Sequence, residues 1–165
     1  MTKKSRKLVP NPTDPSLKPL PKLKGGYYRR IADIDRALDA MGAKQLPPVV
    51  QFLINYFACE KLALGIVGIA NQWPVADAYH VSRRVNLSEL KSAAKSLKLS
   101  VSDGDLDLLF GLAPATARTL RNTLNHDLGP SNVKLVGSHC GMLVPIMSKF
   151  LGCVKEVHNY QRRNF

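Results

Sequence analysis

The stretch VVQFLINYFACEKLALGIVGIA, residues 49–70, is the most apolar part of this 165-residue chain. It is long enough to cross a lipid bilayer. Four polar residues interrupt it: Gln51, Asn55, Glu60 and Lys61. Charged side chains are costly inside a membrane, so the stretch predicts the buried helix of a soluble bundle instead. Pro47-Pro48 is a suitable start for that helix.

Apolar residues recur at helical spacing in several other segments, and capping signals precede two of them. Asn86 with Glu89, and Ser102 with Asp105, form capping boxes. No segment alternates apolar and polar residues as a half-buried strand would. The sequence therefore predicts an all-α, up-and-down bundle of about four to six helices. The expected helices are Tyr28–Met41, Val49–Ala70, Leu87–Leu97, Leu106–Leu112, one from Pro114 to Gly129-Pro130, and about Gly141–Tyr160, with 71–85 a loop or short irregular helix.

The formal net charge of +12 points to a polyanionic partner. Residues 1–30 hold nine of the 24 Lys and Arg and one acid, so most of the excess charge is N-terminal. Five prolines interleaved with lysines predict that residues 1–26 form an extended basic arm, followed by a folded domain over 27–165. This arm would either bind nucleic acid or solubilise the chain. Its candidate nucleic-acid-binding residues are Lys3, Lys4, Arg6 and Lys7.

Cysteine usage favours a reducing, cytoplasmic location. The chain has three cysteines, Cys59, Cys140 and Cys153. Their number is odd and their spacings fit no disulfide framework. No signal peptide follows the basic N-terminus, and no membrane association is expected. His139-Cys140, Cys153 and His158 match no common zinc spacing, so we expect no metal and no cofactor.

A second stretch, Arg121-Asn122-Thr123-Leu124-Asn125-His126, carries the residues best suited to chemistry. On a helix, Asn122 and His126 share one row that Arg118 continues, while Arg121 and Asn125 form the adjacent row. Imidazole transfers protons near neutral pH, and guanidinium grips phosphate. This face therefore suits cleavage of an RNA phosphodiester without a metal.

Structural alternatives stand beside each of these interpretations. A polar Arg/Asn face is often only solvated, and a histidine at a helix end can interact with the terminal carbonyls. Glu60 could orient an arginine or histidine of the second stretch, or it could lie with Lys61 on an exposed strip of the long helix. Arg83 and Arg84, close to His80, could contact RNA or belong to a solvated loop.

Two stretches together resemble the HEPN-domain family of small helical bundles found in toxins, defence systems and RNA-processing factors. FLINYFACEKL (52–62) is similar to the family's early core helix with its Glu-Lys pair, and RNTLNH (121–126) matches its ribonuclease motif of Arg, a polar residue, three residues and His. The likeness spans the core from about residue 27 to residue 160.

The resemblance implies a metal-independent endoribonuclease that acts as a homodimer in a toxin, defence or RNA-processing role. Arg121 would stabilise the charge on the scissile phosphate, His126 would act as general base or acid, and Asn122 would orient the pair or bind the phosphate. Glu60, Arg118 and Asn125 would support them. The products would carry 2′,3′-cyclic phosphate and 5′-hydroxyl ends. RNA is the implied substrate, and an antitoxin or regulatory protein is a further candidate partner.

Two features depart from the family. Many toxin members have a tyrosine shortly after the histidine, where this chain has Asp127-Leu128-Gly129-Pro130, so no modification site of that kind is assigned. The basic arm is not part of the family core. Some members have lost activity, and the alternative is therefore a non-catalytic module that binds nucleic acid or dimerises.

Overall fold

The protein is all-α in the parts that its computed structural model describes, residues 22–42 and 45–164. Residues 1–21 lie outside these parts, and with them the predicted nucleic-acid-binding residues Lys3, Lys4, Arg6 and Lys7. No strand occurs in the described segments. Seven of the described helices have eight or more residues, and α3 has a single turn. The helices are α1 Lys22–Ala40, α2 Pro48–Ala70, α3 Val75–Ala78, α4 Leu87–Ser96, α5 Asp103–Phe110, α6 Ala117–His126, α7 Pro130–Leu151 and α8 Cys153–Asn164.

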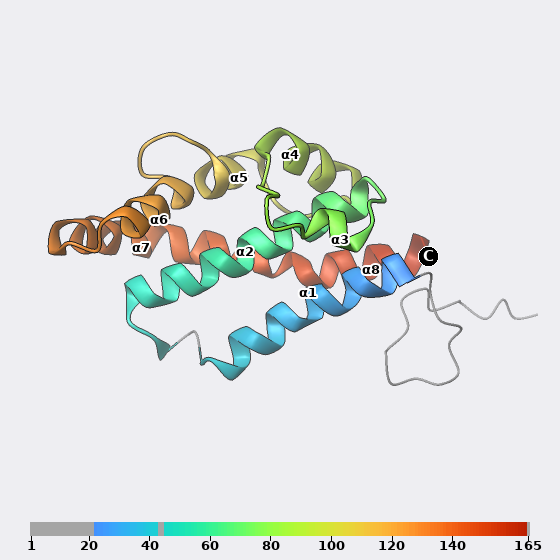
Figure 1. Cartoon of the computed structure of the whole chain (residues 1–165), viewed down its shortest axis with the longest axis horizontal. Coiled ribbons are helices and arrows are strands. Elements are labelled where there is room, and N and C mark those ends of the chain that lie inside the picture. Colours follow the sequence, from blue (N-terminus) through green and yellow to red (C-terminus); the bar gives the residue numbers. More distant parts are fainter. Residues whose placement is uncertain (1–21, 43–44, 165) are drawn as a thin grey trace, which may run out of the picture.

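Helix α2 forms the centre of the fold and packs against α7, α1 and α4 (Figure 1). Most of its apolar side chains are buried or partly buried because neighbouring helices cover it on several sides, as its composition predicts, whereas Val50 and Phe57 are exposed. Tyr56 on α2 lies 6.1 Å from Phe110 on α5, and Phe110 lies 5.5 Å from Phe150 on α7, measured between ring centroids. This aromatic chain ties three helices into one core.

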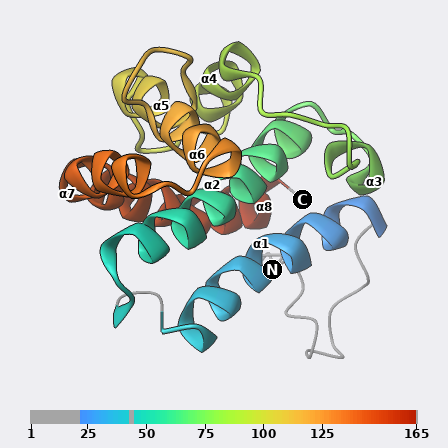
Figure 2. The same cartoon turned by 60° about the vertical axis from the view of Figure 1, so that its left-hand side comes forward.

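The helices do not follow a simple up-and-down order. Helix α1 runs antiparallel to α2, but α7 runs in the same direction as α2 (Figures 1 and 2). The shorter helices α3 to α6 bring the chain back to the end where α2 began, and α7 then starts from there. This return places α6 beside both α2 and α7.

Local capping chemistry sets the starts of α4 and α5 as the sequence predicts. The Asn86 side chain accepts a hydrogen bond from the Glu89 amide at 3.1 Å, and the Ser102 hydroxyl accepts one from the Asp105 amide at 3.0 Å. Helix α6 begins at Ala117 rather than at Pro114, because Thr116 caps it. The Thr116 hydroxyl also donates to the Gly111 carbonyl at 2.9 Å.

Other predicted boundaries besides the start of α6 were wrong, and the expected last helix over about Gly141–Tyr160 is divided at Gly152 into the end of α7 and the start of α8. Helix α1 begins at Lys22, so residues 22–26 are helical rather than the end of an extended arm. Helix α7 begins at Pro130 rather than near Gly141, and it runs through Pro145 to Leu151. Pro145 cannot donate to the Gly141 carbonyl, but both residues are exposed, so water can satisfy that carbonyl.

Two helical stretches are long and apolar enough to cross a membrane by length and composition, Pro48–Ala70 and Pro130–Arg163. About two thirds of the most apolar window of the first is buried in the protein, against one third for the second. Core packing therefore accounts for the composition of α2. The second stretch leaves apolar side chains on the surface of α7, among them Leu135 and Met142.

A substitution at Gly68 on α2 tests how closely this core is packed. A methyl group added there would lie 2.6 Å from Tyr27 Cζ and 2.7 Å from Ala78 Cβ. We expect Gly68→Ala to lower the free energy of unfolding by about 1–3 kcal/mol, because a packed core accommodates added volume poorly. Urea denaturation followed by circular dichroism measures this change.

Gly141→Ala on α7 is the matched control, because a methyl group there would meet no atom within 4 Å. Alanine favours helix over glycine by roughly 0.5–1 kcal/mol, so this variant should be neutral or more stable. Equal stability of the Gly68→Ala variant and the unsubstituted protein would contradict the packing described here.

Candidate functional site

The candidate site is built on α6, which packs against both α2 and α7 (Figure 2). Ala117, Leu120 and Leu124 are buried and hold one face of this helix against the core. Of the 121–126 stretch, Asn125 and His126 are exposed and Asn122 is half-buried, whereas Leu124 packs in the core and Arg121 turns toward α2. This is the amphipathic arrangement that the sequence predicts.

Arg121 on α6 and Glu60 on α2 form an ion pair that joins the two helices. Arg121 Nη2 donates to Glu60 Oε1 at 2.7 Å, and the two side chains are only 18% and 22% exposed. Glu60 therefore points toward α6, whereas its neighbour Lys61 is exposed. Of the two alternatives for Glu60, the structure has the one in which this carboxylate orients an arginine of the second stretch.

Two aromatic rings on α2 complete the surroundings of the Arg121 guanidinium. Its Cζ atom lies 5.3 Å from the ring centroid of Tyr56 and 5.9 Å from that of Phe57. Both distances are in the range of cation–π attraction. A role for these rings was not predicted from the sequence, although they precede Glu60 by four and three residues and are therefore its neighbours on the helix.

The interior side of this cluster holds polar atoms without partners. Among the described residues, neither Arg121 Nε nor the Tyr56 hydroxyl has a hydrogen-bond partner, and both atoms are buried. Burial raises the pKa of Tyr56, and the nearby Glu60 carboxylate raises it further. The phenol therefore stays neutral and cannot serve as a base near neutral pH.

His126 is the last residue of α6 and is exposed. Asn122 is half-buried and Asn125 is exposed on the same helix. Asp127 fixes the turn that follows: its Oδ1 accepts from the Gly129 amide at 2.8 Å. The Asn132 side-chain amide donates to the other Asp127 oxygen at 3.0 Å, which ties the end of α6 to the start of α7.

Arg118 has a structural role in this chain. Its Nη1 donates to the carbonyl oxygens of Val85 at 3.3 Å and Phe110 at 3.2 Å. These contacts hold α6 against the segment before α4 and the end of α5. Arg118 was expected to extend the row of Asn122 and His126, but its guanidinium is engaged with backbone carbonyls.

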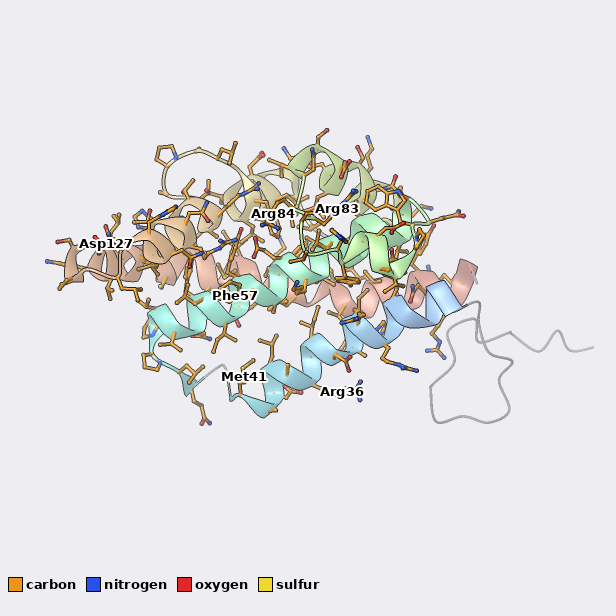
Figure 3. All side chains as sticks on the ribbon, in the orientation of Figure 1. Arg36, Met41, Phe57, Arg83, Arg84 and Asp127 are labelled. Atoms are coloured by element: carbon orange, nitrogen blue, oxygen red, sulfur yellow. The ribbon has the colours of Figure 1, made fainter. Side chains whose placement is uncertain are left out.

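Arg83 and Arg84 lie between α3 and α4 (Figure 3). The Arg83 guanidinium sits 3.7 Å from the ring centroid of Trp73, and its Nη2 lies 3.7 Å from Glu89 Oε2. Arg84 Nη1 donates to the Val81 and Arg83 carbonyls, and its side chain is exposed. Arg83 is therefore occupied by Trp73, and Arg84 is the arginine of this segment that solvent reaches.

The cysteines and histidines do not assemble a metal site in the described segments, where no group of three or more His, Cys, Asp or Glu side chains is arranged to hold an ion. Cys59, Cys140 and Cys153 are all buried. Burial raises the pKa of each thiol, to about 11 for Cys153. These thiols are therefore protonated and unreactive near neutral pH.

Comparison of the chain with protein-family models, with curated proteins and with solved structures gives no match.

Removal of the Glu60 charge tests the ion pair. We expect Glu60→Gln to lower the free energy of unfolding by about 1–3 kcal/mol, because Arg121 loses its charged acceptor in a largely buried position. The matched control is Asp33→Asn, which breaks the exposed Arg36–Asp33 pair on α1 and should cost less than about 0.5 kcal/mol. Urea denaturation of both variants gives the comparison, and equal losses would mean that the Glu60–Arg121 pair contributes no more than a surface pair.

Proposed function

We propose that this protein is a metal-independent endoribonuclease of the HEPN type, which cleaves RNA to 2′,3′-cyclic phosphate and 5′-hydroxyl ends. The observation that carries the proposal is the Glu60–Arg121 ion pair. The two stretches that resemble the family are far apart in sequence, and this pair brings one residue from each into contact. A solvated polar face on α6 would not need an acidic partner inside the most apolar helix of the protein.

Arg121 supplies the charge that the reaction requires. In phosphodiester cleavage, negative charge develops on the non-bridging oxygens of the phosphorus in the transition state. A guanidinium that is already oriented by Glu60, Tyr56 and Phe57 loses little freedom when it binds those oxygens. The Arg121 side chain is 18% exposed, and the phosphate would approach this exposed part.

His126 supplies the proton transfer. The ribose 2′-oxygen attacks phosphorus, its proton passes to a base, and the P–O5′ bond breaks as the 5′-oxygen receives a proton. His126 acts in one of these two transfers, because it is exposed at the end of α6 and can approach a bound strand. Asn122 binds the phosphate or orients the strand from the same helix face.

A complete site requires two copies of the chain. Positions 121 and 126 differ by about 140° around the helix axis, so their side chains diverge within one α6. A twofold pairing of α6 helices would bring Arg121 of one copy to His126 of the other. Exposed apolar side chains in the turn after α6 and on the first half of α7 support such pairing: Leu128, Val133, Leu135 and Met142.

The substrate is a single-stranded region of RNA. The net charge of +12 favours a polyanion, and the exposed Arg84 offers a phosphate contact outside the catalytic residues. The basic N-terminal arm adds salt-dependent attraction through Lys3, Lys4, Arg6 and Lys7. None of these contacts reads a base sequence, so they govern affinity rather than the choice of target.

Incubation of the full chain with total RNA in EDTA tests the activity. We expect cleavage, and a loss of about 100-fold or more in rate for Arg121→Ala and for His126→Ala, because each removes one catalytic group. His139→Ala is the matched control, because it replaces a histidine of α7 outside the candidate site. This variant should cleave RNA at the normal rate. End analysis should find cyclic phosphate.

RNA that stays intact while it binds the full chain would contradict the proposal and favour the non-catalytic binding module. Normal cleavage by Arg121→Ala would show that Arg121 is not catalytic. Normal cleavage by His126→Ala would show the same for His126. Circular dichroism and sedimentation of each variant separate loss of chemistry from loss of fold or assembly.

Mixing the two inactive variants tests the shared site. In a dimer of one Arg121→Ala copy and one His126→Ala copy, one of the two composite sites keeps both groups. After random exchange of subunits we expect about a quarter of the normal activity to return, because half of the dimers are mixed and each has one intact site. No recovery after verified exchange would place Arg121 and His126 in the same copy.

A further inference from the structure

A groove with a volume of about 510 Å³ lies between α1 and α2. Ile54, Phe57 and Lys61 belong to its α2 wall, and Ile34 and Met41 belong to its α1 wall. Phe57 and Met41, on opposite walls, are each 47% exposed (Figure 3). Large apolar side chains that stay exposed on both walls of one groove indicate a surface that binds another molecule.

Phe57 belongs both to this α1–α2 groove and to the surroundings of Arg121. Around the helix axis, its position is about 60° from Glu60 on one side and about 40° from Lys61 on the other. Its ring centroid lies 5.9 Å from Arg121 Cζ, and the same side chain lines the groove. A phosphate bound to Arg121 would therefore lie beside the groove, together with the nucleotides attached to it.

The charges of the groove suit a nucleic acid strand. Arg30, Asp33 and Lys61 are the charged residues among the described ones that line it, and all three are exposed. The Asp33 carboxylate pairs with Arg36 on the same helix, so Arg30 and Lys61 give the described lining a positive excess. Proteins bind single-stranded RNA with surfaces of this kind, in which cations attract the phosphates and the bases stack on aromatic side chains.

We propose that the α1–α2 groove binds one unpaired nucleobase of the RNA strand whose phosphate lies at Arg121. Phe57 stacks on the base, Met41 covers it from the opposite wall, and Lys61 and Arg30 attract the neighbouring phosphates. The volume of the groove is in the usual range for small-molecule sites, about 300–1,000 Å³. The inference rests on the proposed ribonuclease function, because that proposal places the phosphate at Arg121.

The binding of two oligonucleotides that resist cleavage tests this assignment. Both carry 2′-O-methyl riboses, which lack the attacking hydroxyl, and the second strand keeps every phosphate but has abasic residues in place of its bases. We expect Phe57→Ala to weaken binding of the base-bearing strand by about 5–50-fold, because the base loses its stacking partner, and to leave binding of the abasic strand unchanged. Met41→Ala should show the same selectivity with a smaller loss. Fluorescence anisotropy at constant ionic strength measures these affinities.

Two further variants control for other effects. Val50→Ala is the matched control, because Val50 is an apolar side chain of α2 that is 42% exposed and does not line the groove. It should bind both strands as the unsubstituted chain does. Lys61→Gln should weaken binding of both strands by the same factor, because it removes a phosphate contact and no base contact.

Equal affinity of the unsubstituted chain for the two strands would overturn the assignment. An equal loss for both strands in Phe57→Ala would also overturn it, because the ring would then act on phosphate binding through Arg121. Weaker self-association of Phe57→Ala and Met41→Ala in sedimentation, with unchanged binding of the base-bearing strand, would assign the groove to a second copy of the chain instead.

The same strands separate this assignment from the proposed ribonuclease activity, since neither can be cleaved. Binding that depends on the bases and on Phe57, in a protein that leaves total RNA intact, would support the groove and contradict the activity. Cleavage of total RNA without base-dependent binding would support the activity and contradict the groove.

Discussion

A carboxylate inside the most apolar helix of the protein must be paired, and the Glu60–Arg121 ion pair meets this constraint. The pair fixes where α6 can lie. Once Arg121 reaches α2, the buried Leu120 and Leu124 on the neighbouring face contact the core, and Arg118 can donate to the carbonyls that precede α4 and end α5. Contacts to several other segments of the chain thus act together to hold one short helix, which has only ten residues and would not be stable alone.

The polar positions of helix α2 have different surroundings. Glu60 meets α6 and orients the guanidinium, whereas Asn55 lines a cavity between α1, α2 and the end of α7. The part from Leu62 to Ile69 is buried without interruption, whereas Val50, Phe57 and Lys61 of the first part are exposed. A polar group that interrupts an apolar helix is costly to bury unless it has a partner, and Glu60 has this partner in Arg121. The proposed ribonuclease chemistry depends on Glu60.

The sequence predicts this fold best where the cause is local. The capping residues Asn86 and Ser102 start their helices as expected, because each cap is formed within four residues. The path of α7 was not predictable in this way: Pro145 normally ends a helix, but the exposed position of its partner carbonyl lets the helix continue. The candidate site shows the same difference between features with a local cause and features that depend on distant contacts. The spacing predicts the polar face of α6, whereas the turning of Arg118 toward Val85 and Phe110, and the rings of Tyr56 and Phe57 around Arg121, depend on contacts between distant segments.

The claim that Glu60 holds Arg121 ready for catalysis can be measured directly as the single-turnover rate of RNA cleavage by Glu60→Gln. This substitution keeps the shape of the side chain and removes its charge, so the guanidinium stays in place less often. The account predicts a cleavage rate at least about 10-fold lower with an unchanged affinity for RNA, since positioning affects the transition state more than binding. A Glu60→Gln protein that is folded and cuts RNA at the normal rate would contradict it.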